Sequence, residues 1–193
     1  MRSLVSKVWN VAGACALLAA SFALAPAASA SNFGSFGSIG TSGLNSGVWL
    51  TTNSTWTVAK IALTATYSAG VDSAVANQYD PTDLAAYSST VTQCGSVSYD
   101  VCVFDINAGD NGVNGWNACS GPIFGSHPSQ RCQIQWVRIN QFYSPSPSRI
   151  ACHELAHTVG LKHTTDDNSC VYTINLPSGS LTTHDKAHIN ANY

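Results

Sequence analysis

Charged side chains are scarce in this sequence, and they form no block anywhere along it. Asp, Glu, Lys and Arg make up 9% of the 193 residues, and Glu154 is the single glutamate. The formal net charge is −2. Proteins that hold nucleic acid do so through clustered Lys and Arg side chains that neutralise phosphates. The charge distribution therefore argues against nucleic acid as a partner.

Closely spaced cysteine pairs are also missing. The sequence has no C-x-x-C pair, which is the spacing typical of a thiolate metal site, so that alternative is disfavoured. Six of the seven cysteines follow the N-terminal apolar run that holds Cys15, and an even number in an exported chain favours disulfides. Six cysteines allow 15 pairings, among which the sequence cannot choose, and we expect pairing in chain order because it closes short loops. The cysteines concerned are Cys94, Cys102, Cys119, Cys132, Cys152 and Cys170.

Long apolar runs are confined to the N-terminus. Arg2 and Lys7 precede the largely apolar residues 8 to 25, and Ala28-Ser29-Ala30 provides an A-x-A cleavage site. This pattern predicts a signal peptide over residues 1 to 30, so the mature chain is expected to be secreted, extracellular and free of the membrane. A membrane anchor is the alternative, but the run has only 18 residues, is rich in alanine and ends in a cleavage site.

The mature chain is long enough for one domain with a substantial core and too short for two. Residues 31 to 47 (SNFGSFGSIGTSGLNSG) are rich in Gly and Ser and carry no charge. That composition predicts a flexible lead-in without a fold of its own. The folded domain is expected over residues 48 to 193, as a monomer.

Periodicity predicts the main helices and strands. Residues 56 to 79 carry apolar side chains near helical spacing and end at Asp80-Pro81, although their Thr- and Val-rich first half also suits a strand. Residues 97 to 106 alternate and predict a strand, and residues 133 to 139 suggest another. Residues 144 to 148 (SPSPS) predict a helix start, with a serine oxygen as N-cap and a proline in the first turn.

Residues 107 to 125 contain Gly, Asn, Asp and Ser at a density typical of turns, and they predict a long loop or an irregular hairpin. Asp105, Asn107 and Asp110 carry oxygen atoms of the kind that bind calcium, but their spacing misses the EF-hand pattern by a residue. Turn formation is the favoured interpretation, and calcium stays possible but unsupported.

The segment HELAHTVGLKH, residues 153 to 163, concentrates three histidines around the only glutamate. On a helix, His153 and His157 project from one face and can bind one ion. A continued helix would carry His163 ~9 Å further along the axis than His157, too far to share a metal. Gly160 can end the helix in the left-handed conformation and turn the chain back. The spacing therefore predicts a three-histidine metal site that depends on a helix break.

Three neutral histidines leave one position of a tetrahedral zinc ion open, which is typical of a catalytic site. Glu154 can take a proton from a water that the metal activates and deliver it to a leaving amine, so amide hydrolysis is the predicted chemistry. The alternative is a buried helix whose histidines are hydrogen-bonded core residues. His184 and His188 form a second pair four residues apart, but no third ligand accompanies them, so a solvated or capping role is favoured.

The same segment resembles the H-E-x-x-H-x-x-G-x-x-H motif of the metzincin zinc endopeptidases, and the leader makes the chain similar to secreted bacterial members of the snapalysin-like or matrixin-like type. The resemblance implies zinc bound by His153, His157 and His163, with Glu154 as general base and acid. It also implies an α+β zincin-like domain with a twisted mixed sheet, an active-site helix and a short C-terminal subdomain that ends in a helix, similar to residues 181 to 193.

The chain departs from that family in one respect. Metzincins place a methionine in a tight turn beneath the zinc, whereas this chain has no methionine beyond Met1. Residues 169 to 172 (SCVY) lie where the turn is expected, with Val171 as the apolar substitute. Tyr172 follows this position directly, so packing is favoured over a role in stabilising an oxyanion.

These observations predict a secreted zinc-dependent endopeptidase that binds a protein or peptide substrate extended along an edge strand. Two alternatives stay open. One is a catalytically inactive zinc-binding homologue that serves as an adhesin or inhibitor, which loss of the methionine favours and retention of Glu154 disfavours. The other is a zinc hydrolase of non-peptide amides or esters.

Overall fold

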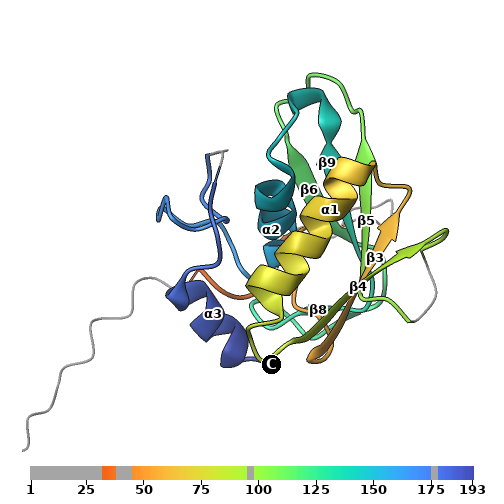
Figure 1. Cartoon of the computed structure of the whole chain (residues 1–193). Coiled ribbons are helices and arrows are strands. Elements are labelled where there is room, and N and C mark those ends of the chain that lie inside the picture. The colour runs from red at the N-terminus through yellow and green to blue at the C-terminus, as the bar shows by residue number, and fades with distance from the viewer. Residues whose placement is uncertain (1–31, 38–44, 95–97, 175–177) are drawn as a thin grey trace, which may run out of the picture. The chain divides into compact units, whose positions relative to one another are not determined.

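A mixed seven-stranded sheet carries two helices on one face in the computed structural model (Figure 1). The structure describes residues 32 to 37, 45 to 94, 98 to 174 and 178 to 193. The signal peptide expected at residues 1 to 30 lies outside these ranges and stays a prediction. Within them, no helix combines the length and the apolar character that crossing a bilayer requires.

The sheet has the strand order β1-β2-β6-β9-β5-β3-β4. Strands β4, β3, β5 and β9 are parallel neighbours, whereas β6, β2 and β1 are added antiparallel. A separate two-stranded sheet pairs β7 with β8. The strands are β1 Phe36–Gly37, β2 Asn45–Val48, β3 Thr55–Ile61, β4 Ala85–Val91, β5 Val101–Ile106, β6 Gly115–Cys119, β7 Ile123–Phe124, β8 Arg131–Cys132 and β9 Gln135–Asn140.

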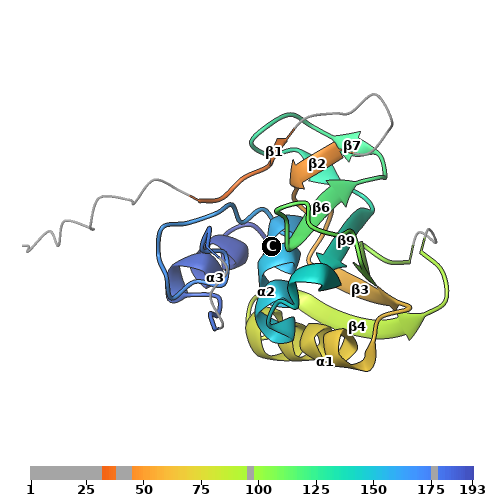
Figure 2. The same cartoon turned by 90° about the horizontal axis from the view of Figure 1, so that it is seen from above.

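Helices α1 (Ala65–Ala74) and α2 (Pro147–Thr158) lie side by side against the sheet in both views (Figure 2). Their close approach depends on Gly70, because a Cβ atom there would lie 2.6 Å from the carbonyl carbon of Pro147. A π-helical turn, Val75–Tyr79, continues α1, and a 3₁₀ turn, Gln141–Tyr143, precedes α2. Helix α3 (Thr183–Asn190) lies near the C-terminus, as the resemblance implies.

The main core fills the space between the two helices and the sheet. Trp56, Val103 and Leu155 are completely buried there, and the ring of Trp56 packs 4.8 Å from that of Tyr79. The Tyr79 hydroxyl donates to the carbonyl of Cys152 at 2.6 Å, which ties the end of the α1 region to the middle of α2. A smaller apolar cluster covers the opposite sheet face, so the central parallel strands are buried on both sides.

The structure decides the alternatives for residues 56 to 79. Their first half forms β3 and only the second half is helical. Strand β5 begins at Val101, inside the range expected for it, and β9 covers residues 135 to 140 rather than 133 to 139. The expected irregular segment from residue 107 contains β6, which pairs along its whole length with β9.

The expectation that residues 31 to 47 lack a fold of their own is wrong for the part that the structure describes. Strand β2 pairs with β6 at Cys119 and Ala118, and β1 pairs with β2. Composition alone does not predict these strands. A segment can join an existing sheet through backbone hydrogen bonds, which need no alternation of apolar side chains.

The cysteines pair in chain order, as predicted: Cys94 with Cys102, Cys119 with Cys132, and Cys152 with Cys170. The third disulfide joins α2 to the segment expected beneath the metal site. Cys152 is buried in the main core, so it faces the scaffold as helical geometry requires.

Replacing Cys152 and Cys170 together by alanine should lower the free energy of unfolding by about 3 kcal/mol, because the bond closes an 18-residue loop in the unfolded chain. The matched control removes Cys94 and Cys102, whose separation is 8 residues and whose loss should cost less. Urea unfolding of both double variants measures the difference. An unchanged unfolding midpoint for the first variant would contradict the prediction.

Candidate metal centre

Helix α2 begins as the sequence predicts, with one correction. Ser146 is the N-cap residue and Pro147 occupies the first turn, where its missing N–H is not needed. The serine side chain, however, makes no capping hydrogen bond. Proline geometry and packing against Gly70 therefore fix the start of the helix, and the expected oxygen cap does not contribute.

The helix ends at Thr158, and Gly160 turns the chain back. Gly160 has a φ of +94°, a conformation that side chains disfavour, and the N–H of Leu161 donates to the carbonyl of Ala156 at 3.0 Å. His163 lies three residues after Gly160, in the segment that runs back toward the helix. The predicted helix break is confirmed at the predicted residue.

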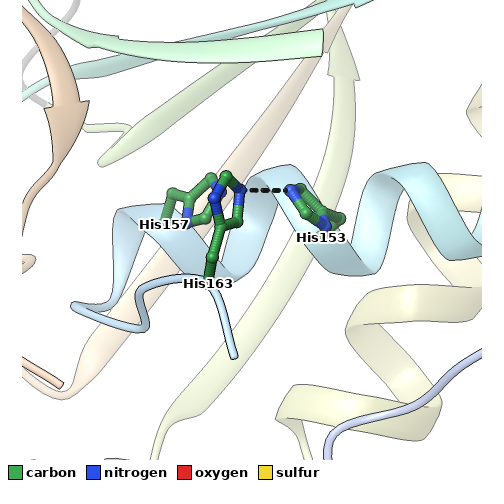
Figure 3. Close-up of side chains that lie close together, drawn as sticks. All are labelled: His153, His157 and His163. Atoms are coloured by element: carbon green, nitrogen blue, oxygen red, sulfur yellow. Dashed lines mark hydrogen bonds between the residues drawn. The ribbon is translucent and has the colours of Figure 1, made fainter. Parts of the chain in front are cut away.

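The break brings His163 back to the two helical histidines (Figure 3). The three ring centroids are 4.8 to 5.0 Å apart, and the Nε2 atoms of His153 and His163 are 3.1 Å apart. One ring nitrogen from each histidine lies within 4.8 Å of the others, which makes this the one group of three possible metal ligands in the described ranges. Nitrogens that share a tetrahedral zinc lie ~3.4 Å apart, so small ring rotations suffice.

Backbone carbonyls orient the two helical imidazoles. Nδ1 of His153 lies 2.7 Å from the carbonyl oxygen of Cys170, and Nδ1 of His157 lies 2.7 Å from that of Leu161. Since a carbonyl only accepts, each Nδ1 carries the proton and each Nε2 presents its lone pair to the centre. This is the tautomer that a metal ligand needs.

Burial keeps the imidazoles neutral. It lowers the pKa of His157 to about 4, places the pKa of His153 well below its usual value, and lowers that of the more exposed His163. The neighbouring imidazole of His157 further disfavours charge on His153. Neutral histidine is the form that coordinates zinc, so the electrostatics and the geometry fit the same ion.

Glu154 lies beside the cluster with its carboxylate buried. The side chain is 3% exposed, and its Oε2 atom has no hydrogen-bond partner among the described residues. Burial raises the pKa of Glu154 to about 8, against the opposing pull of the Arg149 guanidinium. An unpaired buried carboxylate oxygen next to three convergent nitrogens fits a site that would hold a cation and a water molecule.

Gly115 on β6 permits this arrangement, and the sequence gives no sign of its role. A Cβ atom at Gly115 would lie 2.7 Å from Oε1 of Glu154, closer than real contacts allow. Only glycine lets the strand lie directly on the carboxylate. The contact joins residues far apart in the chain, so motif spacing could not identify it.

Two cavities flank the cluster, each of about 200 Å³. Both are lined by Gly115, His153, Glu154 and His163, so the polar centre forms the wall between them. The first is further lined by Phe36, Gly47, Val48, Trp116, Asn117 and His157. The second is further lined by Gly112, Val113, Asn114, Arg149, Ile150 and Thr173. An extended molecule that crosses the centre can therefore occupy a space on each side.

The segment from Ser169 to Tyr172 lies beneath His153, where the resemblance places the methionine turn. Val171 is completely buried in the main core, and the preceding carbonyl holds the His153 ring. Arg149 donates from Nη2 to the carbonyls of Tyr172 and Ile174, which ties this segment to α2. Tyr172 lines neither of the two cavities, and the packing role expected for it stays a prediction.

The second histidine pair also comes together, on α3. The Nε2 atoms of His184 and His188 are 3.2 Å apart and exposed, and no third ligand joins them within the described ranges. The residues considered for calcium have partners typical of turns and caps. Asp105 accepts from the backbone N–H and hydroxyl of Thr64, and Asn107 accepts from the N–H of Gly109.

A histidine triad on a broken helix, with a glutamate after its first member, defines a zinc metallopeptidase of the metzincin type. Within that class, the chain belongs to the family described as dual-action HEIGH metallo-peptidase (Peptidase M57), whose model matches residues 36 to 192.

No curated protein matches the sequence. Among solved structures, the chain is similar to high choriolytic enzyme 1, a hatching-enzyme zinc protease from the medaka fish Oryzias latipes, at 18% identity and a TM-score of 0.32. The match covers 60% of this chain and 50% of the other, so this chain spans about half the length of that protein.

Replacing His163 by alanine should reduce bound zinc to well below one ion per chain, because two imidazoles alone leave the ion weakly held. His184→Ala is the matched control and should keep one ion per chain. Metal analysis after dialysis against a weak chelator measures both. Loss of zinc in the His184 variant would move the site to α3 and contradict the assignment.

Proposed function

We propose that this protein is a secreted zinc-dependent endopeptidase in which His153, His157 and His163 bind zinc and Glu154 is the general base. The observation that supports it best is the buried, unpaired Oε2 of Glu154 beside three converging imidazoles, between two cavities. Membership of a metallopeptidase family supports the same chemistry.

Glu154 performs the proton transfers. When bound, zinc supplies Lewis acidity, which polarises the scissile carbonyl and acidifies a water. The Glu154 carboxylate accepts a proton from that water, which attacks the carbonyl carbon, and it then delivers the proton to the nitrogen of the leaving amine. Burial raises the pKa of Glu154 to about 8 in the metal-free site, and a bound cation would favour the ionised carboxylate that accepts the proton. Gly115 and the packed helix hold the carboxylate in place for both steps.

The two cavities favour cleavage within a chain over removal of a terminal residue, because the cleft continues on both sides of the centre. A substrate strand could pair with β6 near Gly115, beside the centre. The simple edge-strand expectation needs correction here, since β2 already pairs with β6 at Ala118 and Cys119. Only the end of β6 nearest Glu154 is therefore proposed for substrate pairing.

Secretion is supported by the leader pattern and by the three disulfides, which persist in oxidising compartments. We propose that the mature enzyme acts as a monomer on protein or peptide substrates. The inactive-homologue alternative is weakened by the buried Val171, because the turn still delivers the Cys170 carbonyl to His153 without a methionine.

Replacing Glu154 by glutamine should lower kcat by about a thousandfold, because general acid–base catalysis contributes roughly 10² to 10⁴ and glutamine cannot exchange protons. Zinc content should stay at one ion per chain, since the ligands are untouched. Casein and a matched set of small amides and esters, assayed with and without a zinc chelator, give the measurement.

Each rival function has its own signature in that assay. Equal activity of the two proteins would remove Glu154 from the mechanism. Absence of turnover in the wild-type protein with zinc bound would favour the binding module. Cleavage of small acyl substrates without casein would favour the non-peptide hydrolase.

A further inference from the structure

Residues 32 to 34 run beside the turn that carries His163. The carbonyl of Asn32 accepts from the N–H of Lys162, and the N–H of Gly34 donates to the carbonyl of Gly160 at 2.8 Å. Phe33 forms an antiparallel bridge with Leu161 between these two bonds. The start of the described chain thus acts as an added strand along residues 160 to 162, immediately before the third histidine.

The Phe33 ring occupies the space that the glycine leaves empty. Two of its atoms, Cε2 and Cζ, lie 3.0 Å from the position of a Cβ atom at Gly160. The face of the same ring stacks on His188 of α3, with centroids 5.4 Å apart and the planes at 15°. Asn32 adds a hydrogen bond from Nδ2 to the Asp185 carboxylate at 3.1 Å. The turn is therefore held between Phe33 and the rest of the domain.

Phe36 extends from the same segment into the cleft. Its side chain is 59% exposed, yet it lines the first cavity together with Val48 and Trp116. An isolated exposed phenylalanine needs no explanation, but three apolar side chains around one cavity beside the metal centre form a surface for an apolar group.

We infer that residues 32 to 37 are a permanent part of the catalytic cleft, in which Phe33 positions the turn that carries His163 and Phe36 contacts an apolar side chain of the substrate. The role of Phe33 depends only on metal binding, whereas the role of Phe36 rests on the proposed peptidase function. The segment belongs to the active enzyme and is not removed to activate it.

Zinc affinity tests the role of Phe33. In competition with a chelator of known affinity, Phe33→Ala should raise the dissociation constant for zinc about 10-fold, as loss of support behind a ligand commonly does. Phe33→Leu, which keeps part of the volume, should raise it about 3-fold by the same reasoning. Phe124→Ala is the control for loss of a phenylalanine ring elsewhere, because Phe124 lies on β7 and lines neither cavity.

Thermal unfolding of the zinc-free proteins identifies any variant that fails to fold. Should the alanine variant fail, the leucine variant decides. The decisive protein is the folded variant with the smaller side chain at position 33. If that variant binds zinc as tightly as the wild type, Phe33 does not position the turn.

Pairs of peptide substrates test the role of Phe36. The two peptides of a pair differ at one position near the cleaved bond, where one has Leu and the other Ala, and a separate pair is made for each position. Phe36→Ala should lower kcat/KM about 10-fold for the leucine peptide at one position and leave the alanine peptide nearly unchanged. Its zinc affinity should equal that of the wild type. An equal fall for both peptides, or an equally active enzyme form that lacks residues 32 to 37, overturns the inference.

The zinc-affinity and peptide-cleavage experiments test the two roles independently. If the wild-type protein cleaves no peptide, the proposed function and the contact of Phe36 both fail. The zinc series still decides whether Phe33 positions the turn.

Discussion

The turn at Gly160 is the constraint on which the rest of the site depends. Its positive φ ends α2 and returns the chain, so that His163 reaches the imidazoles of the helix. The same turn places the carbonyl of Leu161 where it orients His157. One backbone conformation therefore supplies one ligand and orients another, and a side chain at Gly160 would meet Phe33 as well as strain the backbone.

The site concentrates polar groups where water is largely excluded, and burying such groups costs stability unless a metal ion pairs with them. His153, His157 and Glu154 are each less than a tenth exposed. Burial pushes the pKa of the carboxyl upward and the pKa of the imidazoles downward, so every group is disposed to be neutral without an ion. A cation would relieve this, because it pairs with the imidazole lone pairs and favours the ionised carboxylate. Metal binding and folding are thus expected to support each other.

Sequence alone could reveal the centre of the site because its spacing is local. His153, His157, Gly160 and His163 lie within one helix and its turn, where helical geometry fixes distances. The second half of residues 56 to 79 was predictable for the same reason. The disulfides join cysteines that are close in sequence, in the expected chain order, although the sequence itself does not choose among the possible pairings.

The walls of the cleft could not be predicted, because they depend on pairing between distant segments. Residues 32 to 34 bind residues 160 to 162, and Gly115 meets Glu154, without any periodic signal in either segment. Strand β6 has glycine and asparagine in a stretch that composition assigns to turns, and only its pairing with β9 makes it a strand. Context from tertiary structure overrides propensity at these places.

The separations of the bonded cysteines bear on how an exported chain would mature. Partners are 8, 13 and 18 residues apart, and each pair is complete before the next pair begins along the sequence. A chain that emerges from a membrane pore with its N-terminus first would expose each cysteine to its own partner before a competitor arrived. The order of translocation would then select the native bonds, and little reshuffling by an isomerase would be required.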